Sequence, residues 1–485
     1  MKKYIILILT LLVVLACSDD KYEDYNTDPK NPNKVSADFI FTSSIKNLGD
    51  QMSSPNVNLN IFRFISQYLT ATTYLDEPNY NLTQRNIPTN HWTELYQNVL
   101  YNLKDAKENV RNDLVISEDV LSAEEKDARI AQIEVLEVYT WQVLVDTFGN
   151  IPYTEALKGG ENTLPAYDDA ATIYEDLINR LMLINEDFMS GQGFQSADVI
   201  YEGDMAKWQR FSNSIILRLG MRIADSNPTL SQDAVSFALN NGGVLNGNNE
   251  NALIYYQGFP PNTNPLWVEL VQSGRSDYVT ANTIVDYMTA LNDPRITTYF
   301  DDNLTDDNEN VIYEGGVYGG SNSFSQYTHI GDEFREPAHN GILYDYAEVE
   351  FHLAEAAQRG YTGAGNAESH YNNAITASIK YWGGNDEDAA DYLTQPEVIY
   401  NPVQWKEQIG KEFWTAMYDN PFQGWCVWRK FNSPELNLPE QTQLPVPLRY
   451  TYPIEEQNLN ESNYNEAASS IGGDAQQTPI FWDVN

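Results

Sequence analysis

Histidines and carboxylates are the side chains of this chain best suited to catalysis or metal binding. The five histidines are His91, His329, His339, His352 and His370. They form no His-Glu-x-x-His unit, and the sequence has neither a Gly-x-Ser-x-Gly elbow nor a Gly-x-x-x-x-Gly-Lys phosphate loop. The acidic stretch 301–307 lacks the central glycine and terminal glutamate of a calcium loop, so we expect a solvated loop, with weak calcium association as the alternative. The sequence therefore predicts no catalytic residue, no metal site and no cofactor.

Paired carboxylates are the remaining option for catalysis, because a glycosidase needs two acids that face each other across a cleft. The chain offers Asp76 with Glu77, and Asp332 with Glu333. Among 69 acidic residues, however, close pairs arise by chance, and no spacing rule selects one of them. We therefore expect that the protein is not an enzyme, and a glycoside hydrolase stays as an alternative.

Aromatic and polar residues in three segments are better candidates for ligand binding. An exposed tyrosine or tryptophan ring can stack on the C–H face of a sugar, while neighbouring amides and charged groups bind its hydroxyls. The alternative for each ring is packing in the core or between loops. The expected ligand-binding residues are Tyr74, Asn79 and Tyr80, then Trp267, Arg275, Asp277 and Tyr278, and finally Tyr313, Tyr318 and Tyr327.

The first residues predict export and lipid attachment. A pair of lysines precedes an apolar run from Tyr4 to Ala16, and Cys17 follows directly. This order is typical of a bacterial lipoprotein signal peptide over residues 1–16, although Leu15 is bulkier than usual at its position. Acyl chains such as palmitate on Cys17 would anchor the protein at a membrane surface. A short membrane helix, or cleavage at another position, is the alternative.

Charge and cysteine content restrict the possible partners. The formal net charge of −40 at pH 7 repels phosphate backbones, so nucleic acid is not an expected partner. Besides Cys17, the chain contains one cysteine, Cys426, which lies in an aromatic segment. With Cys17 lipidated, no disulfide can form, and we expect Cys426 to be a buried, inert thiol.

The body that must position these side chains is predicted to be mainly helical. Residues 17–35 are acidic and polar with two prolines, which is typical of a flexible tether after the lipid, and one domain is expected over residues 36–485. From Asp38 to Ile223, apolar residues recur three and four positions apart. Asp204 is the expected N-cap of a helix that includes Trp208.

The second half of the domain is predicted to be richer in loops. Residues 224–341 contain many Gly, Pro and Asn residues and should form loops, apart from a helix over 280–291. Helical periodicity returns at 342–359, where Gly360 is the expected end of the helix, and a partner helix is predicted over 366–381.

Two of these helices carry the spacing of tetratricopeptide repeats. Residues 367–374 place small, aromatic and small side chains four and three apart, and Trp92 with Leu95 loosely matches the first helix of such a repeat. A helical bundle without repeats is the alternative. The final segment 445–485 is rich in Pro, Asn and Gly, so we expect it to wrap over the body without adding a helix.

Several motifs, in order along the chain, resemble the SusD/RagB-like family of surface lipoproteins. The matching stretches run from Tyr25 to Pro29, Gln67 to Leu69, Asp146 to Tyr153, Glu202 to Leu219, Arg275 to Tyr278, Leu291 to Arg295, Ala347 to Ala356 and Tyr452 to Asn458. The resemblance implies an all-α fold with tetratricopeptide-like hairpins and a loop-rich ligand face. Family ligand contacts vary with the substrate, so the candidate residues above rest on their own chemistry.

The resemblance also implies a function. Such a lipoprotein, anchored through Cys17 to the outer face of the outer membrane, captures nutrients and delivers them to a SusC-like TonB-dependent transporter, on which it acts as a lid. The expected ligand is an oligosaccharide. A peptide or another nutrient is the alternative ligand, and a structural adhesin is a further alternative class.

Overall fold

The computed structural model describes residues 35–116 and 120–485. The predicted signal peptide, the lipidation site Cys17 and almost all of the predicted tether lie outside these residues. The α-helices are α3 (Ala37–Ser53), α4 (Phe62–Ile65), α5 (Ile87–Thr93), α6 (Asn102–Arg111), α7 (Ala123–Phe148), α8 (Ala170–Leu183), α9 (Met205–Arg222), α10 (Pro228–Asn240), α11 (Pro265–Trp267), α12 (Asn282–Ala290), α13 (Ile296–Tyr299), α14 (Tyr346–Gln358), α15 (Ala367–Tyr381), α16 (Asp386–Tyr392), α17 (Trp405–Ala416), α18 (Pro421–Phe431), α19 (Ile454–Leu459) and α20 (Glu461–Ser470).

Shorter elements complete the fold. Four strands, β1 (Leu69–Ala71), β2 (Ala252–Ile254), β3 (Tyr278–Thr280) and β4 (Gly341–Tyr344), form the antiparallel pairs β1–β3 and β2–β4. Two π-helical segments, η1 (Glu94–Tyr101) and η6 (Val268–Gln272), continue α5 and α11. The 3₁₀ turns are η2 (Gly159–Glu161), η3 (Asp187–Met189), η4 (Gln195–Ala197), η5 (Asn248–Glu250), η7 (Phe324–Gln326), η8 (Asp332–Arg335) and η9 (Met417–Asp419).

The predicted helical character of the chain is confirmed, and local signals set several helix ends. The side chain of Asp204 accepts a hydrogen bond from the amide of Lys207, so it is the N-cap of α9, as predicted. Gly360 follows α14 with a φ of +77°, a conformation that glycine adopts without strain. Trp208 is fully buried, and so is the thiol of Cys426, whose pKa is raised by burial.

Three expectations about secondary structure are corrected. Residues 341–344 form β4 instead of the start of a helix, because they pair with β2. Helix α10 lies within the predicted loop region, where Asn227 caps it and Pro228 occupies its first position. The expectation that residues 445–485 add no helix is wrong, because α19 and α20 lie there; of α20 only Ala467 is buried, so its sequence lacks an apolar stripe.

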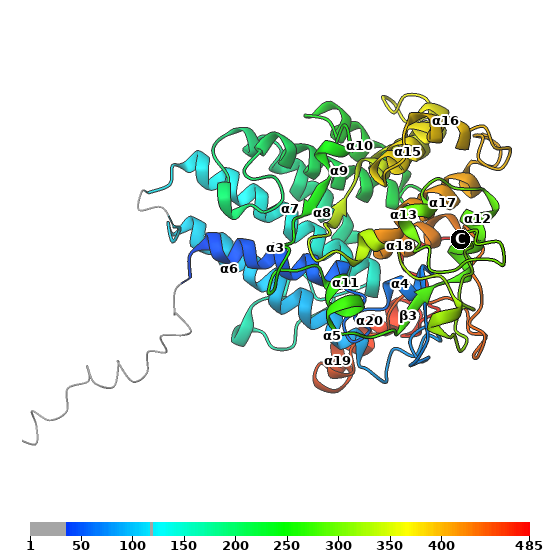
Figure 1. Cartoon of the computed structure of the whole chain (residues 1–485). Coiled ribbons are helices and arrows are strands. Elements are labelled where there is room, and N and C mark those ends of the chain that lie inside the picture. The colour runs from blue at the N-terminus through cyan, green and yellow to red at the C-terminus, as the bar shows by residue number, and fades with distance from the viewer. Residues whose placement is uncertain (1–34, 117–119) are drawn as a thin grey trace, which may run out of the picture.

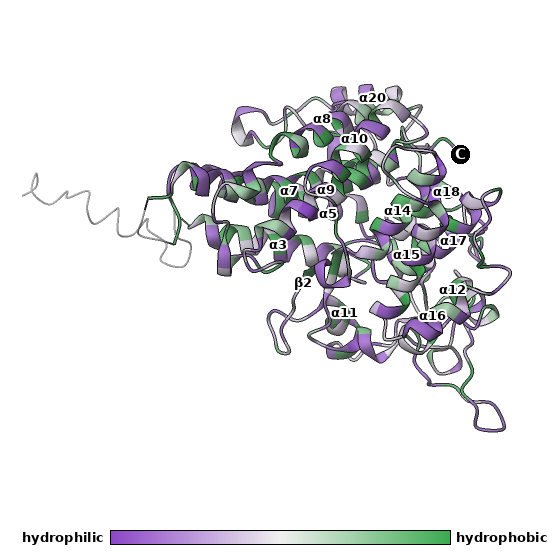
Figure 2. Cartoon of the chain, turned by 90° about the horizontal axis from the view of Figure 1, so that it is seen from above, coloured by the Kyte–Doolittle hydropathy of each residue, from purple (hydrophilic) through white to green (hydrophobic). Residues whose placement is uncertain are grey.

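Many of the helices pack in pairs. The most extensive packing joins α14 with α15 and α9 with α10, which are consecutive in the chain, followed by α17 with α18 and by α3 with α6, two helices that are not consecutive. In Figure 1, α3, α6, α7 and α8 lie on one side, and the segments around β3, α12 and α13 lie on the other. Figure 2 shows hydrophilic residues along peripheral helices such as α16, whereas α7 carries both hydrophilic and hydrophobic residues. In the view of Figure 1, α15, α17 and α18 lie beside α12 and α13, so helix pairs occupy both sides of the molecule and support the loops between them.

Buried ion pairs connect these helix pairs. Arg218 of α9 donates two hydrogen bonds to the carboxylate of Glu348 of α14, at 2.6 and 2.8 Å, and both side chains are almost fully buried. Burial alone would raise the pKa of Glu348, but Arg218 and His352 lower it to about 2. Both residues of the pair are therefore charged at neutral pH and fix α9 against α14.

Candidate ligand-binding site

The pairing of β1 with β3 brings together two loops that are about 200 residues apart in the sequence. Ala71 pairs with Tyr278, and the amide of Thr72 donates to the carbonyl of Asp277 at 2.9 Å. The hydroxyl of Thr73 then donates to the Asp277 carboxylate at 3.1 Å. These bonds extend the two strands and hold the segment after β1 beside the segment before β3.

A third segment closes a small polar cleft between these loops. Asn56 donates to the carboxylate of Glu269 in η6 at 2.8 Å, and Arg85 donates to the side-chain oxygen of Asn58 at 3.4 Å. We call this hollow the cleft. It has a volume of about 150 Å³. It is lined by Asn56, Val57, Asn58, Phe64, Ala71, Thr73, Tyr74, Glu77, Arg85, Glu269, Arg275, Asp277 and Tyr278.

Tyr74 is the exposed aromatic ring of the cleft. Its backbone has a φ of +55°, in the left-handed region that residues other than glycine rarely adopt. The residue is 58% exposed, and the guanidinium of Arg85 lies over its ring, 5.4 Å from the centroid. Tyr278 is half-buried and packs against Phe64 with ring centroids 5.7 Å apart. The cleft thus combines the exposed ring of Tyr74 with the ring of Tyr278, which Phe64 supports.

Charged groups of both signs converge on the same hollow. Arg85 forms an ion pair with the buried carboxylate of Glu77; burial raises the pKa of Glu77, and Arg85 opposes this rise. Arg275 lies 3.4 Å from the carboxylate of Asp277, and its side chain is 55% exposed. A ligand that carries many hydroxyl groups can therefore bond to donors and acceptors in one place.

The other predicted binding residues lie outside the cleft. Asn79, Tyr80 and Tyr318 are buried: the Asn79 amide donates to the carbonyls of Leu75 and Gly319, and Tyr80 packs against Tyr318 at 6.0 Å. These buried side chains pack under the loop that carries Tyr74, and neither tyrosine ring is exposed to solvent.

Three further predicted residues are half-buried and line other parts of the surface. These are Trp267, Tyr313 and Tyr327. Tyr313 packs against Phe300, and the carbonyl of Tyr327 accepts from Asn303. The structure therefore brings together Tyr74, Arg275, Asp277 and Tyr278 and leaves the other six apart.

Several residues of the cleft carry no signal that the sequence analysis could use. Asn56 and Asn58 lie outside the three predicted segments, and Glu269 lies within the second one but is a common acidic residue that residue type alone does not select; the tertiary structure brings all three to the cleft. Arg85 follows Tyr80 in the same loop, so a search for a charged partner close to Tyr74 would have found it.

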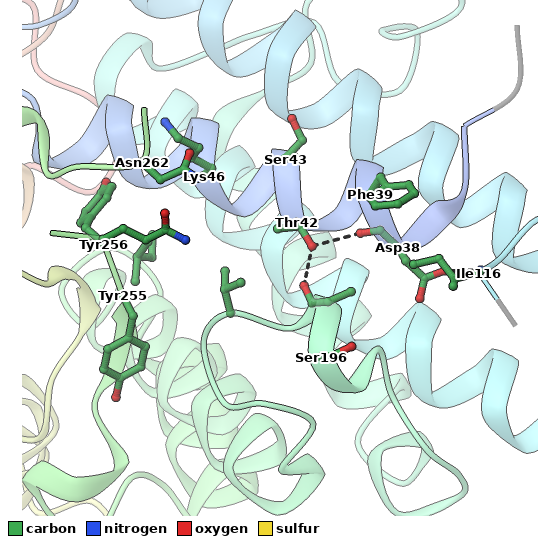
Figure 3. Close-up of a pocket in the computed structure, with 14 residues that line it drawn as sticks. Asp38, Phe39, Thr42, Ser43, Lys46, Ile116, Ser196, Tyr255, Tyr256 and Asn262 are labelled. Atoms are coloured by element: carbon green, nitrogen blue, oxygen red, sulfur yellow. Dashed lines mark hydrogen bonds between the residues drawn. The ribbon is translucent and has the colours of Figure 1, made fainter. Parts of the chain in front are cut away.

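A hollow larger than the cleft lies along helix α3 and is shown in Figure 3. This α3 groove has a volume of about 530 Å³. Phe39 and Tyr255 are 64% and 57% exposed and lie at opposite ends of the view, while the hydroxyl of Thr42 donates to the carbonyl of Ala197 at 2.6 Å. Lys46 forms an ion pair with Asp50. The rings are separated here, and the side chains of Thr42 and Lys46 are already bonded within the protein.

The acid pairs of the sequence do not face each other across a cleft. Glu77 is buried against Arg85, Asp332 forms an ion pair with Arg335, and Glu333 lies 3.6 Å from His339. Within residues 35–116 and 120–485, no three His, Cys, Asp or Glu side chains gather as a metal site would require.

Known proteins share the sequence pattern and the fold of this chain. The sequence profile of a family described as "Starch-binding associating with outer membrane" matches residues 29–453. The chain belongs to the SusD-like family. A solved structure of a chitin-binding protein is similar, with 24% identity and a TM-score of 0.78 over 93% of this chain and 100% of its own. No curated protein sequence matches.

Two further solved structures are similar to this SusD-like chain. A chitin-binding SusD homolog from Flavobacterium johnsoniae has 22% identity and a TM-score of 0.77, over 92% of this chain and 99% of its own. A SusD-like protein from Bacteroides thetaiotaomicron has 21% identity and a TM-score of 0.77, over 93% and 99%. The predicted family and the predicted helical fold are confirmed. In the described part of the SusD-like chain, no helix has the length and apolar character needed to cross a membrane.

Proposed function

We propose that this protein binds oligosaccharides in the cleft and does not cleave them. The observation that carries the proposal is the convergence of the exposed Tyr74 ring with Arg85, Arg275 and Asp277 in one hollow. A ring can stack on the apolar face of a sugar while the charged groups bond to its hydroxyls. The starch-binding description of the family and two similar solved structures of chitin-binding proteins support a glycan ligand.

We further propose where this binding takes place. Lipidated Cys17 and the tether up to Val35 would hold the domain at the outer face of the outer membrane, with which the family is described as associating. The bound glycan would then pass to a SusC-like TonB-dependent transporter, on which the domain acts as a lid. Reversible binding suits this role, because a ligand held too tightly is not delivered.

Calorimetry of the lipid-free domain against chitin-derived and starch-derived oligosaccharides tests the proposal. We expect binding, no shortened products, and weaker binding by the Tyr74→Ala variant. Tyr255→Ala in the α3 groove is the matched control, because it removes a tyrosine of similar exposure. Turnover would instead favour the hydrolase alternative, and retention of peptides in place of glycans would favour the peptide-binding alternative.

A further inference from the structure

A second aromatic hollow lies at the other end of helix α5. It has a volume of about 440 Å³ and is formed by the end of α5, the π-helical segment η1, the loop 152–165 and Glu456. Trp92, Tyr96 and Tyr101 line one side, and prolines and aliphatic side chains of the loop line the other. We call this hollow the η1 groove. π-Helical segments are rare and are frequent at functional sites.

The aromatic rings of the η1 groove are held in place from behind. The half-buried ring of Trp92 lies 4.7 Å from that of Tyr96 and 5.0 Å from that of Phe148, which meets it edge to face. The hydroxyl of Tyr96 donates to the carbonyl of Pro152 at 2.6 Å. A ligand that stacks on such a platform loses little free energy to ordering the protein, because the rings are already fixed.

Polar groups surround these rings. Within the described residues, the side chains of Thr93 and Gln97 make no hydrogen bond to the protein, so both can bond to a ligand. The carboxylate of Glu456 accepts from the hydroxyl of Tyr167 at 2.8 Å and still has free lone pairs. Tyr101 is 42% exposed. The groove therefore has the rings and the rim of hydrogen-bonding groups that a sugar requires.

One face of α5 leads from the cleft to the η1 groove. Asn90 donates to the carbonyl of Asn58, which lines the cleft, at 2.7 Å. Thr93 and Gln97, three and seven residues further on, line the groove. Asn90 and Thr93 are three residues apart in α5 and therefore share a helix face, and Gln97 lies about one turn further on, in the π-helical segment η1.

We propose that the η1 groove is a second sugar-binding subsite, occupied by the same oligosaccharide chain whose other end lies in the cleft. The inference rests on the proposed function of the cleft. The cleft, at about 150 Å³, is smaller than most ligand pockets, so a ligand of several sugar units has to extend beyond it. The face of Asn90, Thr93 and Gln97 leads such a chain to the rings of Trp92 and Tyr101.

A length series of oligosaccharides tests the second subsite. Calorimetry with chitin-derived and starch-derived sugars, from the disaccharide to the hexasaccharide, is compared for the wild type, Tyr101→Ala and Gln97→Ala. Both variants remove partly exposed side chains, so the fold is retained, as melting curves will check. We expect wild-type affinity to rise with length. Tyr101→Ala should weaken hexasaccharide binding about threefold to tenfold and leave disaccharide binding unchanged.

The outcomes separate this inference from the proposed function. If affinity does not depend on length, or if Tyr101→Ala weakens all lengths equally, the second subsite is wrong while glycan binding in the cleft stands. If the wild type binds no sugar, or Tyr74→Ala leaves disaccharide binding unchanged, the proposed function fails and the inference falls with it. Tyr255→Ala should bind every length as the wild type does.

Discussion

The same pair of residue types, an arginine beside a carboxylate, occurs in two regions with opposite consequences. In the helical core, Arg218 and Glu348 are almost fully buried, and two hydrogen bonds of 2.6 and 2.8 Å join them. In the cleft, Arg275 and Asp277 are 3.4 Å apart, and the arginine side chain is 55% exposed. Because the first pair is buried, its loss would leave an unpaired charge in the core, and the pair serves the stability of the fold. The second pair is exposed and contributes little to stability, so its hydrogen-bonding groups stay available to a ligand.

The largest expected effect comes from breaking the buried pair. Glu348→Ala leaves the Arg218 charge in the core without its partner, so we expect the free energy of unfolding to fall by about 3–5 kcal/mol. Urea denaturation of the purified domain measures this loss. The double variant Arg218→Met with Glu348→Leu should recover much of it, because no charge stays buried. A loss below about 1 kcal/mol in the single variant would contradict the assignment.

A pH-dependent contribution is expected from the buried His339 and its two carboxylate partners. Burial lowers the pKa of His339, but the carboxylates of Asp419, at 2.9 Å, and Glu333, at 3.6 Å, raise it overall to about 9. Since the folded pKa lies above the usual 6.5, this contribution is complete below about pH 6.5 and is lost as the pH rises through about 9.

The difference in unfolding free energy between the wild type and His339→Gln measures that contribution. We expect it to shrink as the pH is raised from about 6 to about 9.5, since the imidazole then loses the proton that binds the carboxylates. Comparing the two proteins at each pH cancels the titration of groups that do not interact with His339, and its partners Asp419 and Glu333 have lowered pKa values in the wild type. A difference that stays constant with pH would show that His339 is neutral throughout.

The exposed pair should behave in the opposite way to the buried one. Arg275→Ala should change the free energy of unfolding by less than about 0.5 kcal/mol, because an exposed pair at this distance contributes little. It should weaken oligosaccharide binding about tenfold, the loss expected for hydrogen bonds from a charged donor. Urea denaturation and calorimetry give the two values. If the variant unfolds more easily and yet binds oligosaccharides normally, the prediction is wrong, and Arg275 stabilises the fold instead of binding the ligand.

Local patterns predicted those parts of the fold whose signals lie close together in the chain. Apolar spacing, the Asp204 cap and Gly360 were sufficient for α9, α14 and α15. Strand β4 was missed because its partner, β2, lies almost 90 residues earlier. Helix α20 was missed because its residues carry almost no buried face.

The same division applies to the cleft. Residue type pointed equally to Tyr74 and Tyr80, but only the tertiary structure exposes the first ring and buries the second. Arg275, Asp277 and Tyr74 meet because β1 pairs with β3, a contact that no local pattern specifies. The sequence therefore predicted which kinds of residue could bind a ligand. Which of these residues lie together in the cleft depends on the pairing of distant segments, which the sequence patterns did not reveal.

The smallest expected effect concerns the α3 groove. Tyr255 in the α3 groove is as exposed as Tyr74, yet it lacks the converging charged groups that surround Tyr74. Tyr255→Ala should therefore leave both the free energy of unfolding, within about 0.5 kcal/mol, and oligosaccharide affinity unchanged. Melting curves and the calorimetric series used for Tyr74→Ala provide the measurement. If Tyr255→Ala weakens binding and Tyr74→Ala does not, the glycan binds along α3. The larger volume of the α3 groove would then have been a better guide to the binding site than the charged groups of the cleft.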